Sequence, residues 1–448
     1  MCYKILYIII ITSTIYSQSF FNRIVPEELY YNDARSMSMG KTNISTGQSS
    51  GNIISNPALL SNYIDGIHID MNIDFRSISE RRSIIFKDDW DEALGETDYV
   101  FNQNNYFNHS LGLIYNQSLD RFKIAGAISQ KPFLSLNYNY EEEVRGDANL
   151  ADGVIGIKDP IAGYQSYSTS GTLDVRSAGI SFSLKNNQNR YFSFGIGVND
   201  IIDTRLTDKI KLTIIDDSYG LDNMSSIDDI TNSYLLTTES RFHTVGFQIP
   251  ITNEFVLTLS YEEDLLIGSI SDVDQLLWSS IVGLPQLFDY IEDELTYLPL
   301  GFIYQKPEKR NLGFTYYPKS NVNMLLTFEI TNRYWDLYVW PGYTNNEINE
   351  YKIGFEYDPY NSYPIRAGLV YSESIFDAIE PTTTLTLGTG AKIGKIEFDF
   401  AMNYSTTKYK YFDIFPLENI FIHDCQDIGC DNVTENKLTF LTTLKIGF

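Results

Sequence analysis

The chain has 448 residues, of which 43% are hydrophobic and 14% are aromatic. Its 58 acidic residues outnumber its 33 basic residues and give a formal net charge of −25, which argues against binding to nucleic acid or to anionic lipid surfaces. A soluble chain of this length usually divides into two or three domains, unless its strands close into a single wall.

The N-terminus has the pattern of a signal peptide. Lys4 precedes the apolar run Ile5–Ile11, and the small residue Ser17 stands before Gln18. The apolar run is too short to cross a bilayer as a helix, and no later stretch offers a run of apolar residues long enough to do so. The sequence therefore predicts an exported protein with a signal peptide at residues 1–17, which would cross a membrane only as strands.

Residues 18–63 differ in character from everything that follows. They are rich in Ser, Asn, Gly and Met, they show no sustained alternation, and they contain the motif S-N-P-A-L-L at Ser55–Leu60. One interpretation is a pro-peptide or flexible leader, and the other is a distinct segment that precedes the strands.

From Gly66 onward, apolar and polar residues alternate along the chain. In the first such stretch Ile67, Ile69, Met71 and Phe75 share one face, and His68 and its polar neighbours occupy the other. Alternation over about ten residues is typical of a transmembrane barrel strand. The alternating stretches are Ile67–Arg76, Asn108–Asn116, Arg121–Tyr140, Gly171–Leu184, Tyr191–Val198, Leu236–Ile249, Phe255–Tyr261, Leu312–Tyr317, Met324–Thr331, Tyr351–Tyr357, Ile365–Tyr371, Thr383–Ile393, Ile396–Tyr404 and Leu438–Phe448.

The connections between these stretches alternate between short turns and long loops, which is the habit of outer-membrane barrels. A soluble β-sandwich would also show alternating strands, but it has no reason to alternate its connection lengths. The sequence therefore predicts an all-β fold, a 14-stranded antiparallel transmembrane β-barrel over residues 64–448. Its long extracellular loops are predicted at residues 79–107, 141–170, 213–235, 262–311, 332–350 and 405–437.

Pro132 lies inside the long stretch Arg121–Tyr140. Proline has no N–H to donate to a neighbouring strand, so within a sheet it is confined to edges, strand starts and bulges. Because a closed barrel has no edge, Pro132 predicts a bulge or gap in the wall. The alternative is that two strands meet at Pro132 in a turn.

The loop at residues 262–311 carries apolar residues at helical spacing. Leu276, Leu277, Leu284 and Phe288 belong to this pattern and predict an external apolar binding site, since exposed apolar surface usually marks binding. The alternative is a packed lid that covers the mouth of the barrel.

Few other residues of the sequence could form a disulfide, a metal site or a catalytic site. Cys425 and Cys430 remain once Cys2 leaves with the signal peptide, and a nearby pair in an exported protein favours a disulfide over a metal site. The four histidines stand far apart on different predicted strands or loops, and neither G-x-S-x-G nor H-E-x-x-H occurs. The sequence predicts no catalytic residues, no metal site and no cofactor.

The last stretch, Leu438–Phe448, alternates and ends the chain on an aromatic residue. It resembles the closing strand of bacterial outer-membrane barrels, in which the terminal aromatic residue is the signal read by the barrel-assembly machinery. Phe448 is therefore the expected assembly signal. An edge strand of a soluble β-sandwich is the alternative.

One N-terminal run, A-R-S-M-S-M-G-K followed by N-P-A-L-L, resembles the start of the FadL superfamily of outer-membrane barrels. The positions that match are Ala34, Arg35, Met39, Gly40, Asn56, Pro57, Ala58 and Leu60. Three later runs, at Gly354–Tyr357, Pro364–Tyr371 and Leu387–Ala401, are similar to the PorV-like branch. The chain departs from the family where Lys41 replaces a second glycine and where Ser49 and Ser50 replace a more acidic pair.

This resemblance implies a non-enzymatic protein of the cell outer membrane, in which residues 18–63 plug the lumen of the barrel. Uptake of small hydrophobic molecules would be gated by Gly40, Asn56, Pro57, Ala58 and Leu60. A wall opening at Pro132, facing Asn56–Ala58, would release apolar ligand sideways into the bilayer. The implied partners are outer-membrane lipid, the barrel-assembly machinery and a hydrophobic ligand. The alternative is a PorV-like component of type IX protein secretion and surface attachment, whose partners are secretion-system proteins. A structural or adhesive barrel is a third hypothesis.

Overall fold

The computed structural model describes residues 26–87, 90, 93–145, 160–186, 190–202, 204–215, 230–238, 241–269, 302–319, 323–335, 345–360, 363–376, 379–412 and 430–448. Several predictions fall outside these residues: the signal peptide, Cys425, and the apolar loop residues Leu276, Leu277, Leu284 and Phe288. Among the described residues, no helix is long and apolar enough to cross a membrane.

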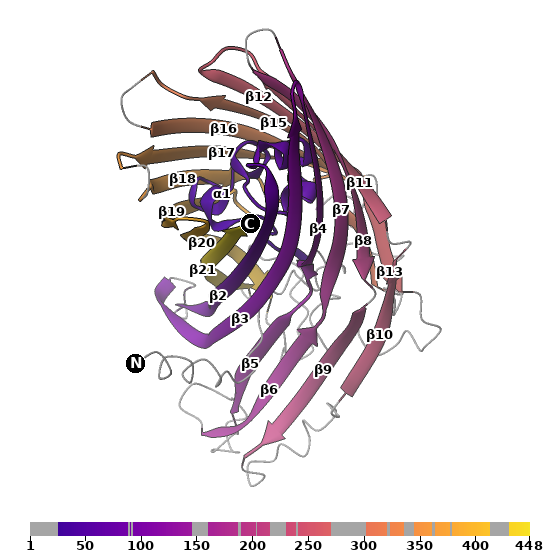
Figure 1. Cartoon of the computed structure of the whole chain (residues 1–448). Helices are drawn as coiled ribbons and strands as arrows, with labels where there is room; N and C mark the ends of the chain where they lie inside the picture. The colour runs from indigo at the N-terminus through magenta and orange to yellow at the C-terminus, as the bar shows by residue number, and fades with distance from the viewer. Residues whose placement is uncertain are drawn as a thin grey trace, which may run out of the picture.

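The main sheet contains fifteen strands, and all of them except the two-residue strand β1 form a closed antiparallel ring (Figure 1). The fourteen strands of the ring are β2 (Gly66–Lys87), β3 (Ala93–Leu119), β4 (Phe122–Ser135), β7 (Thr172–Lys185), β8 (Tyr191–Ile202), β11 (Arg241–Pro250), β12 (Phe255–Glu262), β15 (Glu308–Tyr316), β16 (Asn323–Tyr334), β17 (Glu347–Asp358), β18 (Ile365–Ser372), β19 (Thr382–Ile393), β20 (Ile396–Phe412) and β21 (Cys430–Gly447). Each overlaps one predicted stretch, so the predicted 14-stranded antiparallel barrel is confirmed.

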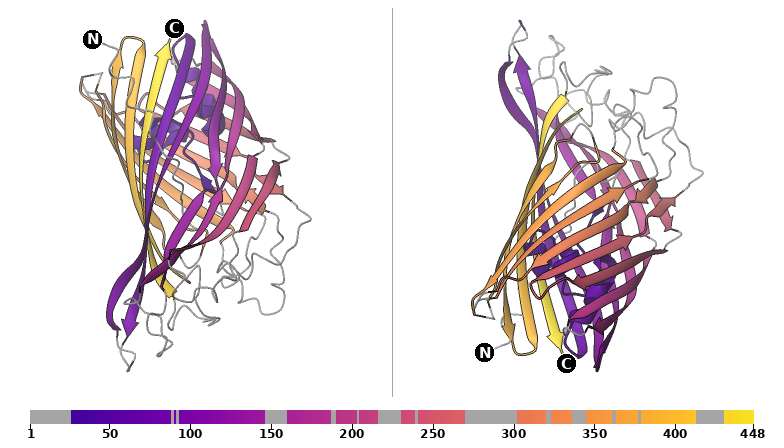
Figure 2. Two further views of the ribbon diagram at one scale, coloured as in Figure 1. Left: turned by 90° about the horizontal axis from the view of Figure 1, so that it is seen from below. Right: turned by 90° about the horizontal axis from the view of Figure 1, so that it is seen from above.

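The ring closes where its first and last strands pair, and a second sheet is inserted between successive strands such as β4 and β7. β2 pairs with β21 from His68 opposite Gly447 to Ser83 opposite Asn432, and β4 pairs with β7. The C-terminus and the short turns lie at one end of the barrel, and the long extensions of β2 and β3 lie at the other (Figure 2).

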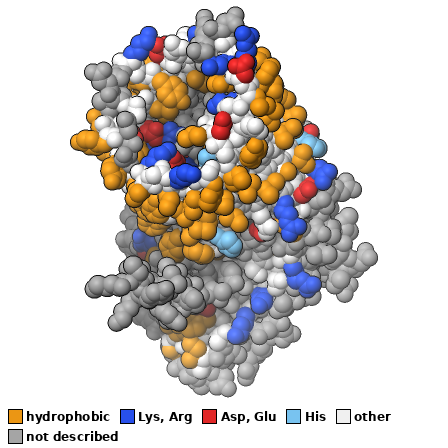
Figure 3. Space-filling model, in the orientation of Figure 1, with side chains coloured by type: hydrophobic (Ala, Val, Ile, Leu, Met, Phe, Trp, Pro, Cys, Tyr) orange, Lys and Arg blue, Asp and Glu red, His pale blue; other side chains and the backbone are white. Residues whose placement is uncertain are grey.

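The alternation of the strands sorts side chains between the two faces of the wall. On β2 the side chain of Phe75 is 39% exposed, whereas that of Asp70 on the other face is only 2% exposed. On β20, Phe398 is exposed on the outside and Asn403 is buried on the inside. Hydrophobic side chains gather over the outer face of the barrel (Figure 3), as a lipid-facing wall requires.

A second sheet continues the barrel at the end away from the C-terminus (Figure 1). Its order is β14-β13-β10-β9-β6-β5, and its strands are β5 (Tyr138–Arg145), β6 (Ile161–Ser170), β9 (Thr204–Ile214), β10 (Ile230–Thr238), β13 (Leu265–Ser269) and β14 (Phe302–Lys306). Parts of these strands lie within the predicted loops 141–170, 213–235 and 262–311, so those predicted loops contain strands.

The other predicted loops need the same correction. β2 and β3 extend well into residues 79–107, and β20 and β21 extend into residues 405–437. β16 and β17 likewise enter residues 332–350. The physical reason is that these extensions, such as Glu80–Ser83 of β2, lack the alternation of apolar and polar residues on which the strand prediction rested.

Residues 26–63, called here the N-terminal segment, pack against the inner face of the wall. The segment contains β1 (Glu27–Glu28), three short helices, α1 (Ala34–Ser38), α2 (Asn43–Thr46) and α3 (Asn52–Ser55), and the 3₁₀ helix η2 (Pro57–Asn62). Two of its helices begin at polar caps: the Asp33 side chain accepts a hydrogen bond from the N–H of Ser36, and the Asn56 side chain caps η2, which starts with Pro57. Such caps satisfy the free N–H groups of a first turn.

The wall is interrupted at β4. Its pairing with β3 runs only from Phe122 to Gln130, whereas its pairing with β7 continues to Ser135 with a register shift between Pro132 and Leu134. β1 pairs with the free edge of β4, with Glu28 opposite Leu134. The strand does not turn at Pro132. It ends at Ser135, and two residues separate it from the start of β5.

Candidate functional site: the N-terminal segment and the luminal cavity

The motif Asn56-Pro57-Ala58 lies against β7, β8 and β11. The Asn56 amide donates a 2.8 Å hydrogen bond to the carbonyl oxygen of Ile44, and the Ser181 hydroxyl of β7 donates to the carbonyl oxygen of Ala58 at 3.1 Å. A β-carbon at Gly195 on β8 would clash with the backbone of Pro57. Asn56 therefore fixes the internal shape of the segment, and the wall glycine lets the segment approach closely.

Two other predicted gate residues also have packing roles. Leu60 is buried in a small apolar cluster with Ile53, Ile114 and the alanines of β4. Gly40 has a φ of +69°, and a β-carbon there would clash with the carbonyl oxygen of Ile353. Glycine is required at position 40 because a left-handed conformation and a close backbone contact coincide there.

A ladder of alternating charges links the segment to the wall. The guanidinium of Arg35 in α1 donates two hydrogen bonds of 2.8 Å to the Glu356 carboxylate on β17. Arg366 contacts Glu356 at 2.6 Å and Asp399 at 2.7 Å, and Lys445 contacts Asp399 at 3.2 Å. All five side chains are at most 16% exposed. We call this set the charge ladder.

The two glutamates of β1 reach opposite sides of the barrel. Glu27 pairs with Lys437 on β21 and with Arg76 on β2, the latter at 3.3 Å. Glu28 pairs with Lys309 on β15 and with Arg333 on β16, the latter at 3.0 Å. In the order of the ring, β2 and β21 lie across the barrel from β15 and β16. β1 therefore forms a crossbar through the lumen.

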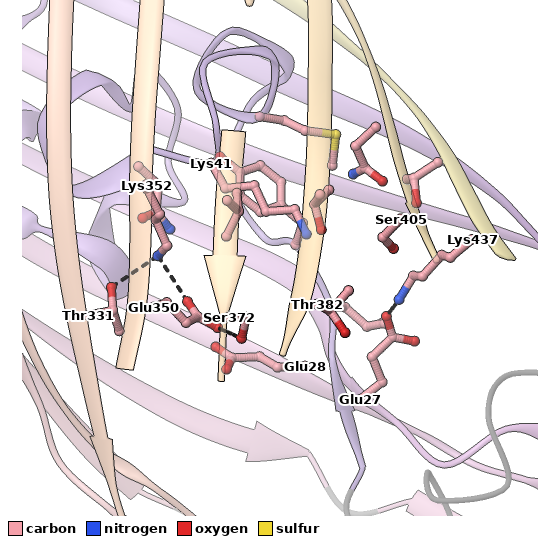
Figure 4. Close-up of a pocket in the computed structure, with 18 of the residues that line it drawn as sticks. Glu27, Glu28, Lys41, Thr331, Glu350, Lys352, Ser372, Thr382, Ser405 and Lys437 are labelled. Atoms are coloured by element: carbon pink, nitrogen blue, oxygen red, sulfur yellow. Dashed lines mark hydrogen bonds and ion pairs between the residues drawn. The ribbon is translucent and has the colours of Figure 1, made fainter. Parts of the chain in front are cut away.

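A cavity of about 360 Å³ lies beside this crossbar (Figure 4). Its lining includes β1, Lys41 of the N-terminal segment, and inward-facing residues of β15 to β21. Apart from Leu29, Met37, Ile44, Ile78, Val370 and two tyrosines, every side chain that lines it is polar or charged. The lumen of this barrel is therefore a polar chamber, as the inward face of the strands predicts.

Lys41 stands out among the residues of this cavity. It has a φ of +57°, a left-handed conformation that is uncommon for residues other than glycine. Its ammonium extends into the cavity between Lys352 on one side and Ser405 and Lys437 on the other (Figure 4). Burial lowers the pKa of this ammonium, an effect that Glu350 opposes and Lys352 reinforces.

The backbone conformation of Lys41 gives a first testable prediction. We expect Lys41→Gly to be about 1 kcal/mol more stable than Lys41→Ala, because both remove the ammonium but only glycine relieves the left-handed backbone. Urea unfolding of the purified protein in detergent, followed by tryptophan fluorescence, measures the difference. Equal midpoints for the two variants would show that the backbone at position 41 carries no strain.

The segment next to Pro132 is not the one that the sequence predicts. Leu29, Tyr30 and Tyr31 line a small cavity of about 10 Å³ together with Pro132 and His109, whereas Asn56–Ala58 lie against β7, β8 and β11. The prediction that a wall opening faces Asn56–Ala58 is therefore corrected: the start of the N-terminal segment lies at this position. The reason is the pairing of β1 with the free edge of β4.

An apolar cluster surrounds the bulge. Phe133 contacts Tyr31, with ring centroids 5.8 Å apart, and Phe242, with centroids 5.5 Å apart. The cluster continues through Leu173 and Val175 of β7 to Ile267 of β13 and Tyr304 of β14 in the second sheet. It therefore connects the second sheet with the interruption of the wall by an unbroken set of buried apolar side chains.

The remaining predicted site residues lie apart from the cavity. The N–H of Phe448 donates a 2.9 Å hydrogen bond to the carbonyl oxygen of Ile67, and its side chain is 64% exposed. Cys430 opens β21 opposite Phe412, and its predicted disulfide partner Cys425 is outside the described residues. Within the described part of the chain, no group of three or more His, Cys, Asp or Glu residues could hold a metal ion.

The charged residues of the cavity and the charge ladder were not predicted from the sequence as a site. They come from strands hundreds of residues apart, as the contact between Arg35 and Glu356 illustrates. One signal was available at Lys41, since the resemblance places a glycine there. A lysine in place of that glycine could have marked the Lys41 side chain as a candidate functional group.

Comparisons with known proteins identify the fold of this chain. No protein-family model matches the sequence, and no curated protein matches it. Among solved structures, the toluene transporter TodX of Pseudomonas putida shares 15% identity and covers 94% of this chain and 99% of its own, with a TM-score of 0.53. A FadL homologue of Pseudomonas aeruginosa shares 13% identity and covers 94% of this chain and 100% of its own, with a TM-score of 0.55. The chain therefore has the fold of TodX and of this FadL homologue.

Proposed function

We propose that this protein is an outer-membrane channel for the uptake of small hydrophobic molecules, that the N-terminal segment is its gate, and that ligand leaves through the wall beside Pro132. The observation that carries the proposal is the interruption of the wall: β3 stops pairing with β4 at Gln130, and β1 pairs with the edge that is left. The function of the proteins with the same fold supports the class of ligand, since TodX is named as a toluene transporter.

The apolar cluster supplies the route. It extends from the second sheet to Phe133 at the bulge, so an apolar ligand that enters from the second sheet meets apolar side chains until it reaches the wall. Release into the bilayer is favourable because an apolar molecule loses stability when it enters water. Leu29, Tyr30 and Tyr31 occupy the inner side of this exit, so their movement opens it.

A reversible cross-link between β1 and β4 tests the gate. Glu27 and Ser135 are directly opposed in the antiparallel pair, at a spacing that suits a disulfide. We expect Glu27→Cys/Ser135→Cys, in a chain with Cys425 and Cys430 replaced by serine, to take up N-phenyl-1-naphthylamine only under reducing conditions. Uptake should fall under oxidising conditions to the level of cells that lack the protein, because β1 can no longer leave the exit.

The single variant Glu27→Cys is the matched control, since it loses the same ion pairs but cannot form the cross-link. Uptake that is equal in the oxidised and reduced double variant would contradict the lateral exit. If cells with the wild-type protein take up no more probe than cells without it, the uptake proposal itself fails, and the PorV-like role in secretion becomes the leading hypothesis.

A further inference from the structure

We propose that the luminal cavity beside β1 binds a small hydrophilic organic anion, a carboxylate that also carries hydroxyl groups, with the Lys41 ammonium as its charged contact. This site lies beyond the proposed uptake of hydrophobic molecules, because its lining is mostly polar and shares only Tyr31 with the apolar cluster at Phe133.

The charges of the cavity leave one cation without a partner. Its lining contains six basic side chains, Lys41, Arg76, Lys309, Arg333, Lys352 and Lys437, and five acidic ones, Glu27, Glu28, Asp74, Glu350 and Glu435. Arg76, Lys309, Arg333, Lys352 and Lys437 each pair with a carboxylate. Among the described residues, the Lys41 ammonium alone of the six cationic groups has no hydrogen-bond or ion-pair partner, so one positive charge remains for a ligand.

The wall opposite Lys41 offers hydrogen-bonding groups. Thr384, Ser405, Asn403 and Thr439 come from the adjacent strands β19, β20 and β21, and they line the cavity as cross-strand neighbours. Within the described residues these four side chains make no hydrogen bond to another group. Buried polar groups are nearly always paired, so hydroxyl groups of a ligand are suitable partners for this polar patch.

The backbone at Lys41 supports a binding role. A left-handed lysine is costly, and such conformations persist at functional sites where the surrounding structure imposes them. Gly40 before it is fixed by its contact with Ile353, and the Lys41 side chain then extends into the cavity (Figure 4). The position holds a charge toward the open space, whereas glycine would suit the fold at lower cost.

The class of ligand follows from this lining. A long-chain amphiphile would place methylene groups against Thr384, Asn403 and Thr439, and would leave their polar atoms without water or partners. A neutral sugar would leave the Lys41 charge unpaired. A compact hydroxylated carboxylate satisfies both the ammonium and the polar patch, and charge-assisted hydrogen bonds make the first of these contacts the stronger.

Titration calorimetry of the purified protein in detergent tests this site with three probes. We expect gluconate to bind, and glucose and octanoate to bind at least about tenfold more weakly, since each lacks one of the two features. Lys41→Gln should weaken gluconate binding about ten- to a hundredfold, and Lys41→Arg should retain it. Asn403→Leu should also weaken it, because the polar patch loses an amide.

The matched control is Lys392→Gln, which removes an exposed lysine that pairs with Glu397 in the turn at the C-terminal end. It should leave gluconate binding unchanged. The proposal is overturned if gluconate does not bind the wild-type protein, if octanoate binds more tightly than gluconate, or if Lys41→Gln binds as the wild type does. Uptake of N-phenyl-1-naphthylamine reports separately on the hydrophobic route, so the two proposals can fail independently.

Discussion

Replacing Glu356 by glutamine is expected to loosen the N-terminal segment and to make the barrel leak ions. The Glu356 carboxylate accepts hydrogen bonds from both Arg35 of the segment and Arg366 of the wall. Glutamine keeps the size of the side chain but leaves two buried guanidinium groups short of a counter-charge. Removing one partner of a buried ion pair costs about 3–5 kcal/mol, which is a large fraction of the free energy that holds a short segment in place.

Planar-bilayer conductance and thermal unfolding in detergent measure this effect. Glu356→Gln should raise the open-channel conductance and lower the unfolding temperature. Glu397→Gln is the matched control, because the ion pair of Glu397 with Lys392 is exposed to solvent and should contribute at most about 1 kcal/mol. Wild-type conductance and stability in Glu356→Gln would show that the charge ladder does not hold the segment.

Deletion of Phe448 is expected to abolish assembly of the barrel with little effect on the stability of a barrel that has formed. The Phe448 side chain is 64% exposed, so its removal costs little packing energy. Its N–H bonds the carbonyl oxygen of Ile67, a single backbone contact of about 1 kcal/mol. If the terminal aromatic residue is the signal that the barrel-assembly machinery reads, the loss in cells should far exceed the loss of stability in vitro.

The two quantities are measured separately. The amount of folded, heat-modifiable protein in outer-membrane fractions should fall nearly to zero, whereas protein refolded in detergent should unfold at almost the wild-type urea concentration. Ile396→Ser, which alters a similarly exposed apolar residue on the outer face of β20, should assemble normally. A variant without Phe448 that reaches the outer membrane in wild-type amounts would contradict the assigned role.

The strands of the wall were predictable because each carries its own signal. Phe75 is exposed on the outer face and its neighbour Asp74 lines the luminal cavity, and this difference appears in the sequence as a period of two. The strands of the second sheet were less predictable. β6, which runs Ile161–Ser170, lies entirely within the predicted loop 141–170, because its sequence I-A-G-Y-Q-S-Y-S-T-S has no sustained alternation of apolar and polar residues.

The site was less predictable because its residues meet only in three dimensions. Asn56, Pro57 and Ala58 could be selected from a resemblance, but their position against β7, β8 and β11 could not. In the sequence, Glu27 and Glu28 have no feature that distinguishes them from other acidic residues. Only the fold brings cations from opposite walls of the barrel next to them. Charge pairs of this kind depend on the closure of the ring, and a linear pattern does not contain that information.

The N-terminal segment also bonds to both strands of the β2–β21 closure. The Asp70 carboxylate on β2 accepts two 2.9 Å hydrogen bonds from Ser50, and the Thr443 hydroxyl on β21 accepts one of 2.7 Å from the N–H of Ala34. Ala34 and Thr443 are 409 residues apart in the sequence, so this contact requires the final strand to be in place. The N-terminal segment therefore bridges the seam between the first and last strands of the ring, and its hydrogen bonds fasten the closed cylinder as well as filling its interior.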